Sequence, residues 1–178
     1  PIYYADERAK ALMTENEELR AQLIATFGAQ TYTPDGTLNR AYLAGIVFQN
    51  DEKLAQLNAL VHPIVQQDGE RWQALQQDAP YTLREAALLF ESGIYRSLDK
   101  IIVVTAPEDL RIARVVARDQ TTPAAVRARM DKQWPEERKV ALADFVIYND
   151  GEQLLIPQVL DIHKQLLGET KKLCTNRP

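Results

Sequence analysis

Glycine is scarce in this sequence, and its spacing excludes a Walker-type phosphate loop. The 178 residues contain seven glycines: Gly28, Gly36, Gly45, Gly69, Gly93, Gly151 and Gly168. No two are closer than eight residues, so neither Gly-x-x-x-x-Gly-Lys-Ser/Thr nor Gly-x-Gly-x-x-Gly can occur. The chain also begins with Pro1 and not with Met. We therefore expect a fragment whose missing N-terminus held a first strand and a phosphate loop; the alternative is a processed protein that never had them.

Cysteine, long apolar runs and excess positive charge are also missing. The one cysteine, Cys174, can form neither an internal disulfide nor a metal cluster, which fits a reducing, cytoplasmic location. No apolar run approaches the roughly 20 residues that span a bilayer, and no basic-then-apolar leader opens the chain. The net charge of −4 argues against a broad surface for nucleic acid and leaves room for a local basic pocket. The sequence does not specify an oligomeric state.

The apolar patterning predicts an α/β fold. Strand-like stretches lie at 2–4, 81–90, 100–105 and 145–148. They alternate with amphipathic helices, which predicts a parallel sheet flanked by helices. The strand at 100–105 is expected to be fully buried, and the chain length suits a single domain.

Two stretches stand apart from this alternation. Residues 14–77 are helical in pattern and would form a subdomain; Thr14 and Glu17 resemble the capping box of one of its helices. Pro63 falls inside another helix and predicts a kink there. Residues 121–139 are polar and Arg-rich and would form a lid.

Three side chains are candidates for chemistry, and two of them, Asp6 and Glu91, lie at the carboxyl edge of the sheet, where α/β proteins bind ligands. Asp6 follows the first strand, and a carboxylate there can accept a proton from a hydroxyl nucleophile or help to hold magnesium. Spacing alone favours the plainer role of a helix N-cap. Glu91 ends a predicted strand at this edge. His62 could reach a substrate phosphate, although a lone histidine beside a proline is more often structural.

Basic residues gather in the second half of the chain. Arg114 and Arg118 lie four apart, so they share a helix face that could bind phosphate or stack on a purine. The alternative is a solvated face whose arginines pair with neighbouring acids, Glu108, Asp109 or Asp119.

The predicted lid has a comparable pair of interpretations. Its cations are Arg127, Arg129, Lys132, Arg138 and Lys139. A mobile basic lid that closes over a polyphosphate has this composition, because closure excludes water and brings positive charge to the transferred group. A charge run is more often a solvated helix. The turn at 149–151, Asn-Asp-Gly, follows a buried strand and could edge a base pocket.

Taken together, these blocks resemble dephospho-coenzyme A kinase over nearly the whole chain. The matching blocks, in order, are Ile2 to Asp6, Asp35 to Leu43 with Phe48, Leu57 to Pro63, Ala87 to Glu91, Arg114 to Asp119, Arg129 with Gln133, and Ala143 to Gly151. Each block is loose, but their order and spacing are specific. Tyr4 stands where the family has an Asp, and Ala87 where it has a Pro.

The resemblance implies a reaction and a set of residue roles. The family transfers the ATP γ-phosphoryl group to the ribose 3′-hydroxyl of dephospho-coenzyme A, using Mg²⁺ and a phosphate loop that this chain lacks. Asp6 would be the base, and residues 14–77 would form the acceptor subdomain. Acceptor binding would fall to Arg40, His62 and Glu91. ATP and lid contacts would come from Arg114, Arg118, Arg129, Gln133, Lys139, Asn149 and Gly151.

Two other functions remain open from the sequence. One is a non-catalytic binding module that kept its nucleotide or coenzyme A sites but lost the phosphate loop. The other is a different nucleotide kinase of similar fold, which the blocks at Asp35–Arg40 and His62–Pro63 oppose. Because the phosphate loop is missing, a polypeptide that starts at Pro1 is expected not to catalyse the kinase reaction by itself.

Overall fold

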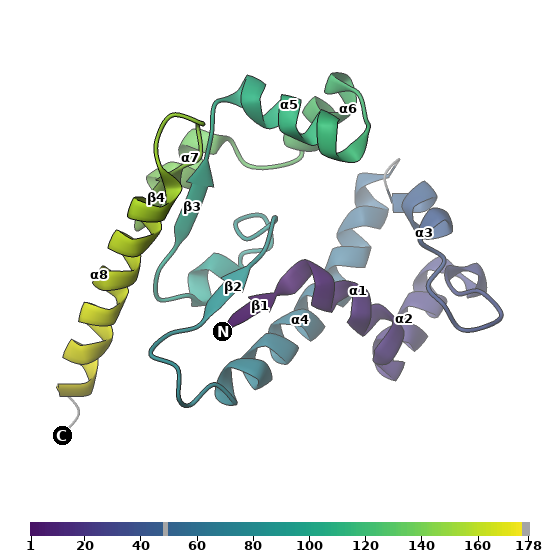
Figure 1. Cartoon of the computed structure of the whole chain (residues 1–178). Coiled ribbons are helices and arrows are strands. Elements are labelled where there is room, and N and C mark those ends of the chain that lie inside the picture. Colours follow the sequence, from purple (N-terminus) through teal and green to yellow (C-terminus); the bar gives the residue numbers. More distant parts are fainter. Residues whose placement is uncertain (48–49, 176–178) are drawn as a thin grey trace. The chain divides into compact units, whose positions relative to one another are not determined.

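The computed structural model describes residues 1–47 and 50–175, with side chains as far as Glu169 (Figure 1). Phe48 and the side chain of Cys174, both considered above, lie outside the described part. The chain divides into two compact units, Pro1–Ala87 and Leu88–Pro178. Each unit is treated by itself below.

Unit 1 is mostly helical and contains one small parallel sheet. Its elements are β1 (Ile2–Tyr4), α1 (Ala5–Glu15), α2 (Glu17–Phe27), the short 3-10 helix η1 (Ala29–Thr31), α3 (Arg40–Val47), α4 (Asp51–Ala74) and β2 (Leu83–Glu85). β1 pairs with β2 in parallel, with Tyr3 opposite Arg84. Leu19 and Leu23 of α2 are completely buried in the core that the helices share.

The boundary between α1 and α2 corrects one expectation. Thr14 remains inside α1, and the residue that caps α2 is Asn16, whose side chain accepts a hydrogen bond of 2.8 Å from the Leu19 amide. Asn is among the best N-cap residues because its short side chain reaches the free amides of the first turn. Gly28 ends α2 with φ of 93°, a conformation that glycine adopts without a steric penalty.

Helix α4 continues through Pro63 as one element of 24 residues. Asn50 caps it by accepting from the Lys53 amide at 3.0 Å. Val61 and Val65 are buried on either side of the proline. Packing of this face stabilises the helix against the one backbone hydrogen bond that proline cannot donate.

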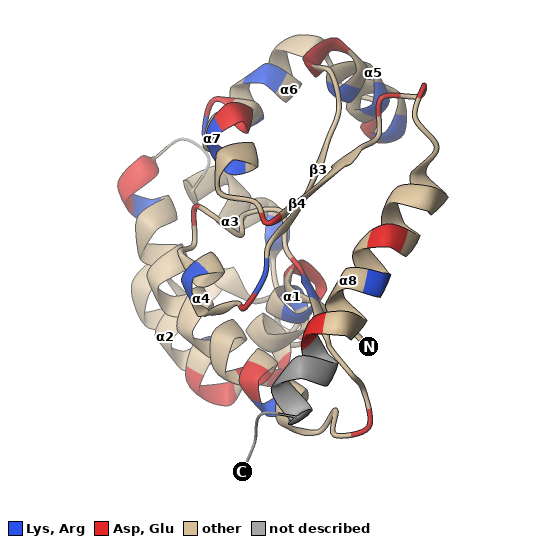
Figure 2. Ribbon diagram, turned by 90° about the vertical axis from the view of Figure 1, so that its left-hand side faces the viewer, with Lys and Arg blue, Asp and Glu red and all other residues tan. Residues whose placement is uncertain are grey.

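Unit 2 contains a second small parallel sheet. Its elements are the 3-10 helix η2 (Ile94–Ser97), β3 (Ile102–Thr105), α5 (Glu108–Asp119), α6 (Pro123–Met130), α7 (Glu136–Ala141), β4 (Phe145–Tyr148) and α8 (Leu155–Thr175). β3 and β4 pair in parallel from Ile102 opposite Phe145 to Thr105 opposite Tyr148. The predicted α/β architecture with parallel strands is therefore confirmed. Helices α5 and α7 carry both basic and acidic residues, whereas the charged residues of α6 are basic (Figure 2).

Two strand predictions were wrong in detail. The strand expected at 81–90 is ordered only as β2, and residues 88–92 form turns closed by the Ser92 amide on Leu88 O and the Gly93 amide on Phe90 O. Backbone groups that find no neighbouring strand are satisfied locally in this way. In β3, Val103 is buried but Val104 is 57% exposed, because a two-stranded sheet covered on one face follows the period-2 pattern.

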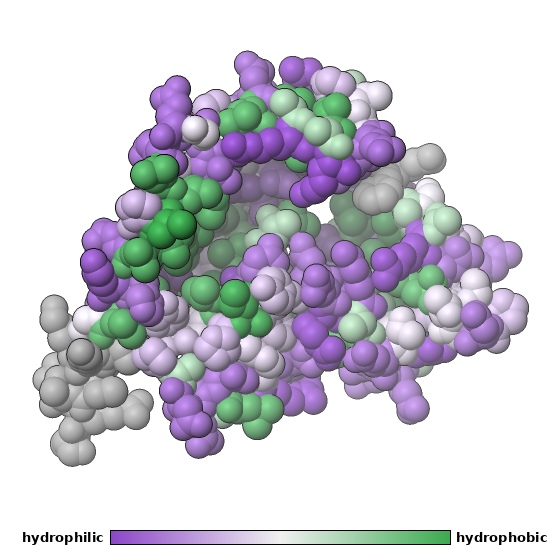
Figure 3. Space-filling view, viewed as in Figure 1, coloured by the Kyte–Doolittle hydropathy of each residue, from purple (hydrophilic) through white to green (hydrophobic). Residues whose placement is uncertain are grey.

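Helix α8 packs on β4 less completely than its pattern predicts. Ile162 is buried, whereas Leu155 and Val159 are exposed. Gln158 ties the helix to the strand by accepting from the Tyr148 amide and donating to the Tyr148 carbonyl. Apolar side chains consequently gather on the surface around β4 and the first turns of α8 (Figure 3). This patch consists of Tyr148, Leu154, Leu155, Ile156, Val159 and Leu160.

Candidate active site

Asp6 lies in the first turn of α1, directly after β1, with an exposed side chain. The N-cap position belongs to Tyr4, which makes no side-chain capping hydrogen bond. The alternative that Asp6 is the cap of this helix is therefore wrong. Among the residues that the structure describes, none forms a hydrogen bond or ion pair with the Asp6 carboxylate. This leaves Asp6 available for a ligand at the carboxyl end of a parallel strand.

The other two unit 1 candidates occupy different settings. Arg40 opens α3 and is exposed. His62 lies within α4 and is partly buried, and this burial lowers the pKa of its imidazole. A neutral His62 can offer one N–H donor to a phosphate but no positive charge. No hydrogen bond or ion pair joins Asp6, Arg40 and His62 within the described part of unit 1.

In unit 2 the structure brings the basic helix to the Asn-Asp-Gly turn. Arg114 of α5 donates to the Asn149 carbonyl at 2.7 Å, across 35 residues of sequence. The turn itself is held by Asp150, whose carboxylate accepts from the amides of Glu152 and Gln153. These bonds lower the pKa of Asp150. Gly151 follows with φ of 89°, which favours glycine.

A single carboxylate holds two arginines together. Asp119 accepts from Arg118 Nε at 2.7 Å and from Arg129 Nη1 at 3.1 Å. The pKa of Asp119 is lowered, chiefly by the hydrogen bond from Arg118. Both arginine side chains remain mostly exposed, at 73% and 60%. The sequence alternative that Arg118 pairs with a neighbouring acid is therefore confirmed, yet each guanidinium keeps further donors open to solvent.

Glu91 and Lys139 form a largely buried ion pair. Their Oε1 and Nζ atoms lie 3.2 Å apart, and the two side chains are 15% and 12% exposed. Glu91 Oε1 also accepts from the Trp134 amide at 2.7 Å, and Lys139 donates to Gln133 Oε1 at 2.9 Å. The second oxygen of Glu91 is buried without a hydrogen-bond partner in the described part of the chain.

Several contributors were missed from the sequence. Trp134 packs in an aromatic cluster with Phe90 and Tyr95, at ring-centroid distances of 5.8 Å to each. The guanidinium of Arg138 lies 3.4 Å above the Trp134 ring. Glu136, an acidic residue within the predicted lid, pairs with Arg111 of α5 at 3.1 Å. Only the aromatic at 134 could have signalled an anchored segment.

No metal cluster is evident among the described residues, since none of them form a group of three or more His, Cys, Asp or Glu side chains. Magnesium in kinases typically takes one or two carboxylates and fills its shell with phosphates and waters. The free carboxylate of Asp6 fits such a minimal role. Nor does any helix in the described ranges have the length and apolar content to cross a membrane.

Comparison with known proteins gives one family. The dephospho-CoA kinase (CoaE) family profile matches residues 1–154. Dephospho-CoA kinase from Salinibacter ruber is 43% identical over 152 residues, covering 84% of this chain and 76% of the relative. Dephospho-CoA kinase from Chlorobaculum tepidum is 40% identical over 173 residues, with 93% and 83% covered.

Solved structures agree with the sequence relatives. A crystal structure of the protein TT1252 from Thermus thermophilus superposes with a TM-score of 0.77 at 32% identity, covering 95% of this chain and 84% of that one. Dephospho-CoA kinase from Campylobacter jejuni gives a TM-score of 0.60 at 28% identity, with 98% and 83% covered. The fold and the family are thus found by independent comparisons.

Proposed function

The chain belongs to the dephospho-CoA kinase family of coenzyme A biosynthesis, and from this premise we propose that its two units divide the substrates. Unit 1 supplies the groups for the acceptor, dephospho-coenzyme A, and unit 2 supplies those for ATP. The observation that carries the proposal is the contrast between Asp6 and the basic residues. Asp6 is exposed with no partner in the described part of the chain, whereas in unit 2 Arg118 and Arg129 share the Asp119 carboxylate and Arg114 donates to the Asn149 carbonyl.

Asp6 is proposed as the general base of the transfer. A carboxylate at this position can accept the proton of the ribose 3′-hydroxyl as that oxygen attacks the γ-phosphorus of ATP; the bond between the γ-phosphorus and its bridging oxygen breaks, and ADP leaves. Arg40 and a neutral His62 would bind acceptor phosphates. Magnesium, when bound, would neutralise charge on the ATP phosphates.

Unit 2 would hold the nucleotide. The pair formed by Arg118 and Arg129 presents two guanidiniums on one carboxylate, an arrangement that suits a polyphosphate. Arg114 and the turn at 149–151 would edge the base. Glu91, Gln133 and Lys139 would position the predicted lid at 121–139 through the buried ion pair of Glu91 with Lys139 and the hydrogen bond of Lys139 to Gln133.

The test compares the chain alone with the chain joined, ahead of Pro1, to the phosphate-loop segment of a family member. We expect no ATP-dependent phosphorylation of dephospho-coenzyme A by the chain alone and turnover by the joined protein, because electrostatic stabilisation by the loop is the part that the chain lacks. Changing the loop lysine to Ala in the joined protein is the matched control and should abolish turnover.

Two results would contradict the proposal. A folded joined protein that binds ATP and dephospho-coenzyme A but transfers nothing would favour a binding module. A joined protein that phosphorylates nucleoside monophosphates faster than dephospho-coenzyme A would favour another nucleotide kinase.

A further inference from the structure

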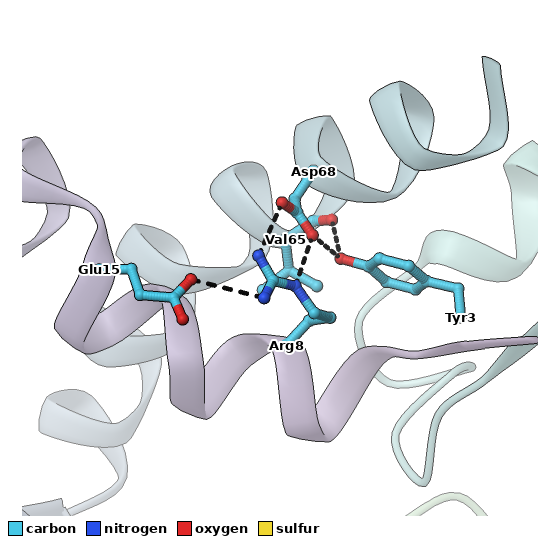
Figure 4. A network of polar contacts seen from close by, with 5 residues as sticks. All are labelled: Tyr3, Arg8, Glu15, Val65 and Asp68. Atoms are coloured by element: carbon cyan, nitrogen blue, oxygen red, sulfur yellow. Dashed lines mark hydrogen bonds and ion pairs between the residues drawn. The ribbon is translucent and has the colours of Figure 1, made fainter. Parts of the chain in front are cut away.

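One carboxylate in unit 1 is bound from both sides of the β1–α1 junction (Figure 4). Asp68 of α4 accepts from the Tyr3 hydroxyl of β1 at 2.8 Å. It also accepts from Arg8 of α1 in a bidentate arrangement, with Nε at 3.0 Å and Nη2 at 3.1 Å. The Tyr3 hydroxyl additionally reaches the Val65 carbonyl at 3.1 Å. Bidentate arginine–carboxylate pairs fix direction as well as distance.

The tyrosine in this network is fixed on all sides. Tyr3 is 2% exposed, and Trp72 of α4 lies 5.5 Å from it between ring centroids. The Arg84 guanidinium from β2 lies 5.1 Å from the Tyr3 ring centroid. Burial, followed by the hydrogen bond to Asp68, raises the pKa of the Tyr3 hydroxyl, which therefore stays protonated and donates.

The two anchored residues enclose Asp6. Tyr3 precedes it by three residues and Arg8 follows it by two, so one acidic side chain fixes both ends of a short stretch. Asp6 itself is exposed and has no partner among the described residues. The direction of its carboxylate is thus set by the backbone of this stretch, and the backbone is held by Asp68.

We propose that Asp68 is a positioning residue for phosphoryl transfer: it holds the β1–α1 junction so that Asp6 points at the acceptor hydroxyl. This inference rests on the proposed role of Asp6. A small misplacement of a catalytic group can cost up to about a hundredfold in rate, even when the altered residue is remote from the chemistry. Asp68 touches neither substrate in this scheme and acts only through Asp6.

The test is a double-mutant cycle in the joined protein, with kcat and the KM for ATP as readouts. Asp6→Asn removes the base and should lower kcat at least a hundredfold, since general-base catalysis contributes roughly 10²–10⁴. Asp68→Asn should lower kcat about tenfold, within the range for misplacement, and leave the KM for ATP within about twofold. The double variant should match Asp6→Asn, because a positioning residue has nothing left to position.

A purely structural role predicts a different pattern. It would lower the melting temperature of Asp68→Asn without changing kcat, or it would lower kcat by the same factor in the parent and in the Asp6→Asn background. Either result overturns the inference. The matched control is Glu15→Gln, which removes the outer partner of Arg8, 3.4 Å away and 60% exposed, and should leave kcat unchanged.

The cycle separates this inference from the proposed function. If Asp6→Asn retains kcat within about threefold of the parent, far below the general-base range, then Asp6 is not the base and the proposed mechanism fails first. If Asp6→Asn is severely impaired and Asp68→Asn is not, only the positioning role fails.

Discussion

At the scale of single residues, the sequence pointed to Asp6 as a candidate but not to Asp68, which contacts residues on both sides of Asp6. Asp6 was identified because a carboxylate after a strand has few roles, and the structure removes the capping alternative. Asp68 went unnoticed because it lies mid-helix in an ordinary polar stretch. Its partners, Tyr3 and Arg8, are about 60 residues away, and no local pattern reports a contact of that range.

Gly69 is a second residue whose role only the structure explains. It is buried inside α4, where glycine costs roughly 0.8–1.0 kcal/mol relative to alanine. A Cβ at this position would lie 1.6 Å from Arg84 Nη2. The missing side chain thus makes room for the guanidinium that stacks on Tyr3.

This geometry predicts that the effect of Gly69→Ala on the free energy of unfolding depends on whether Arg84 is present. With Arg84 present, Gly69→Ala gains helix propensity but displaces the guanidinium and loses a cation–π contact of about 0.5–2 kcal/mol, so stability should change little or fall. With Arg84→Ala already made, Gly69→Ala should stabilise by about 1 kcal/mol. Urea unfolding followed by tryptophan fluorescence measures both steps, and equal effects in the two backgrounds would refute the contact.

At the scale of elements, the sequence pattern predicted a helix or strand correctly where its formation depends on neighbouring residues along the chain. The strand at 145–148 was predicted with its observed bounds because a short apolar run precedes a strong turn signal. Residues 86–90 carry a similar apolar run but find no partner strand, and only pairing, which the sequence does not show, decides between strand and turn. The lid and subdomain boundaries remain predictions.

Helix α7 is rich in charged residues, and one of them, Lys139, forms a largely buried ion pair with Glu91. Lys139→Met would leave the Glu91 carboxylate largely buried without its counter-ion. Breaking such a pair typically costs 3–5 kcal/mol, and we expect about 3 kcal/mol because both side chains retain slight exposure. The double variant Glu91→Gln with Lys139→Met should recover most of this loss, since no buried charge remains. Chemical denaturation monitored by Trp134 fluorescence provides the measurement.

The contrasting interpretation is that Lys139 serves ATP alone. In that case Lys139→Met would leave the free energy of unfolding unchanged and raise only the KM for ATP in the joined protein. Arg127→Met is the matched control: Arg127 is exposed on α6, and surface substitutions usually stay within about 0.5 kcal/mol.

At the scale of the whole molecule, two units with separate cores make two reporters possible. The chain has two tryptophans, and they fall one in each unit: Trp72 packs on Tyr3, and Trp134 packs on Phe90. Variants that retain one tryptophan, with Phe at the other position, therefore follow each unit separately. Non-coincident transitions would show that the chain does not unfold in a single step.

Low pH should destabilise unit 1 through protonation of Asp68. The hydrogen bond from Arg8 is the main cause that lowers the pKa of Asp68 in the folded state. The stability that ionised Asp68 contributes is therefore present above the ordinary aspartate pKa near 3.8. This stability is lost as the pH falls toward and through the lowered pKa of the folded state.

We therefore predict that lowering the pH from 7 to 3 reduces the urea midpoint reported by Trp72. The loss for unit 1 from Asp68 should be about 1 kcal/mol by pH 3, since this pH lies roughly one unit below the ordinary aspartate pKa near 3.8 and each pKa unit corresponds to about 1.4 kcal/mol. Asp68→Asn should lower the Trp72 midpoint at pH 7 and flatten its pH dependence, because no carboxylate remains to titrate there. A Trp72 midpoint that still falls as steeply with acid in Asp68→Asn would place the acid-sensitive group elsewhere in unit 1.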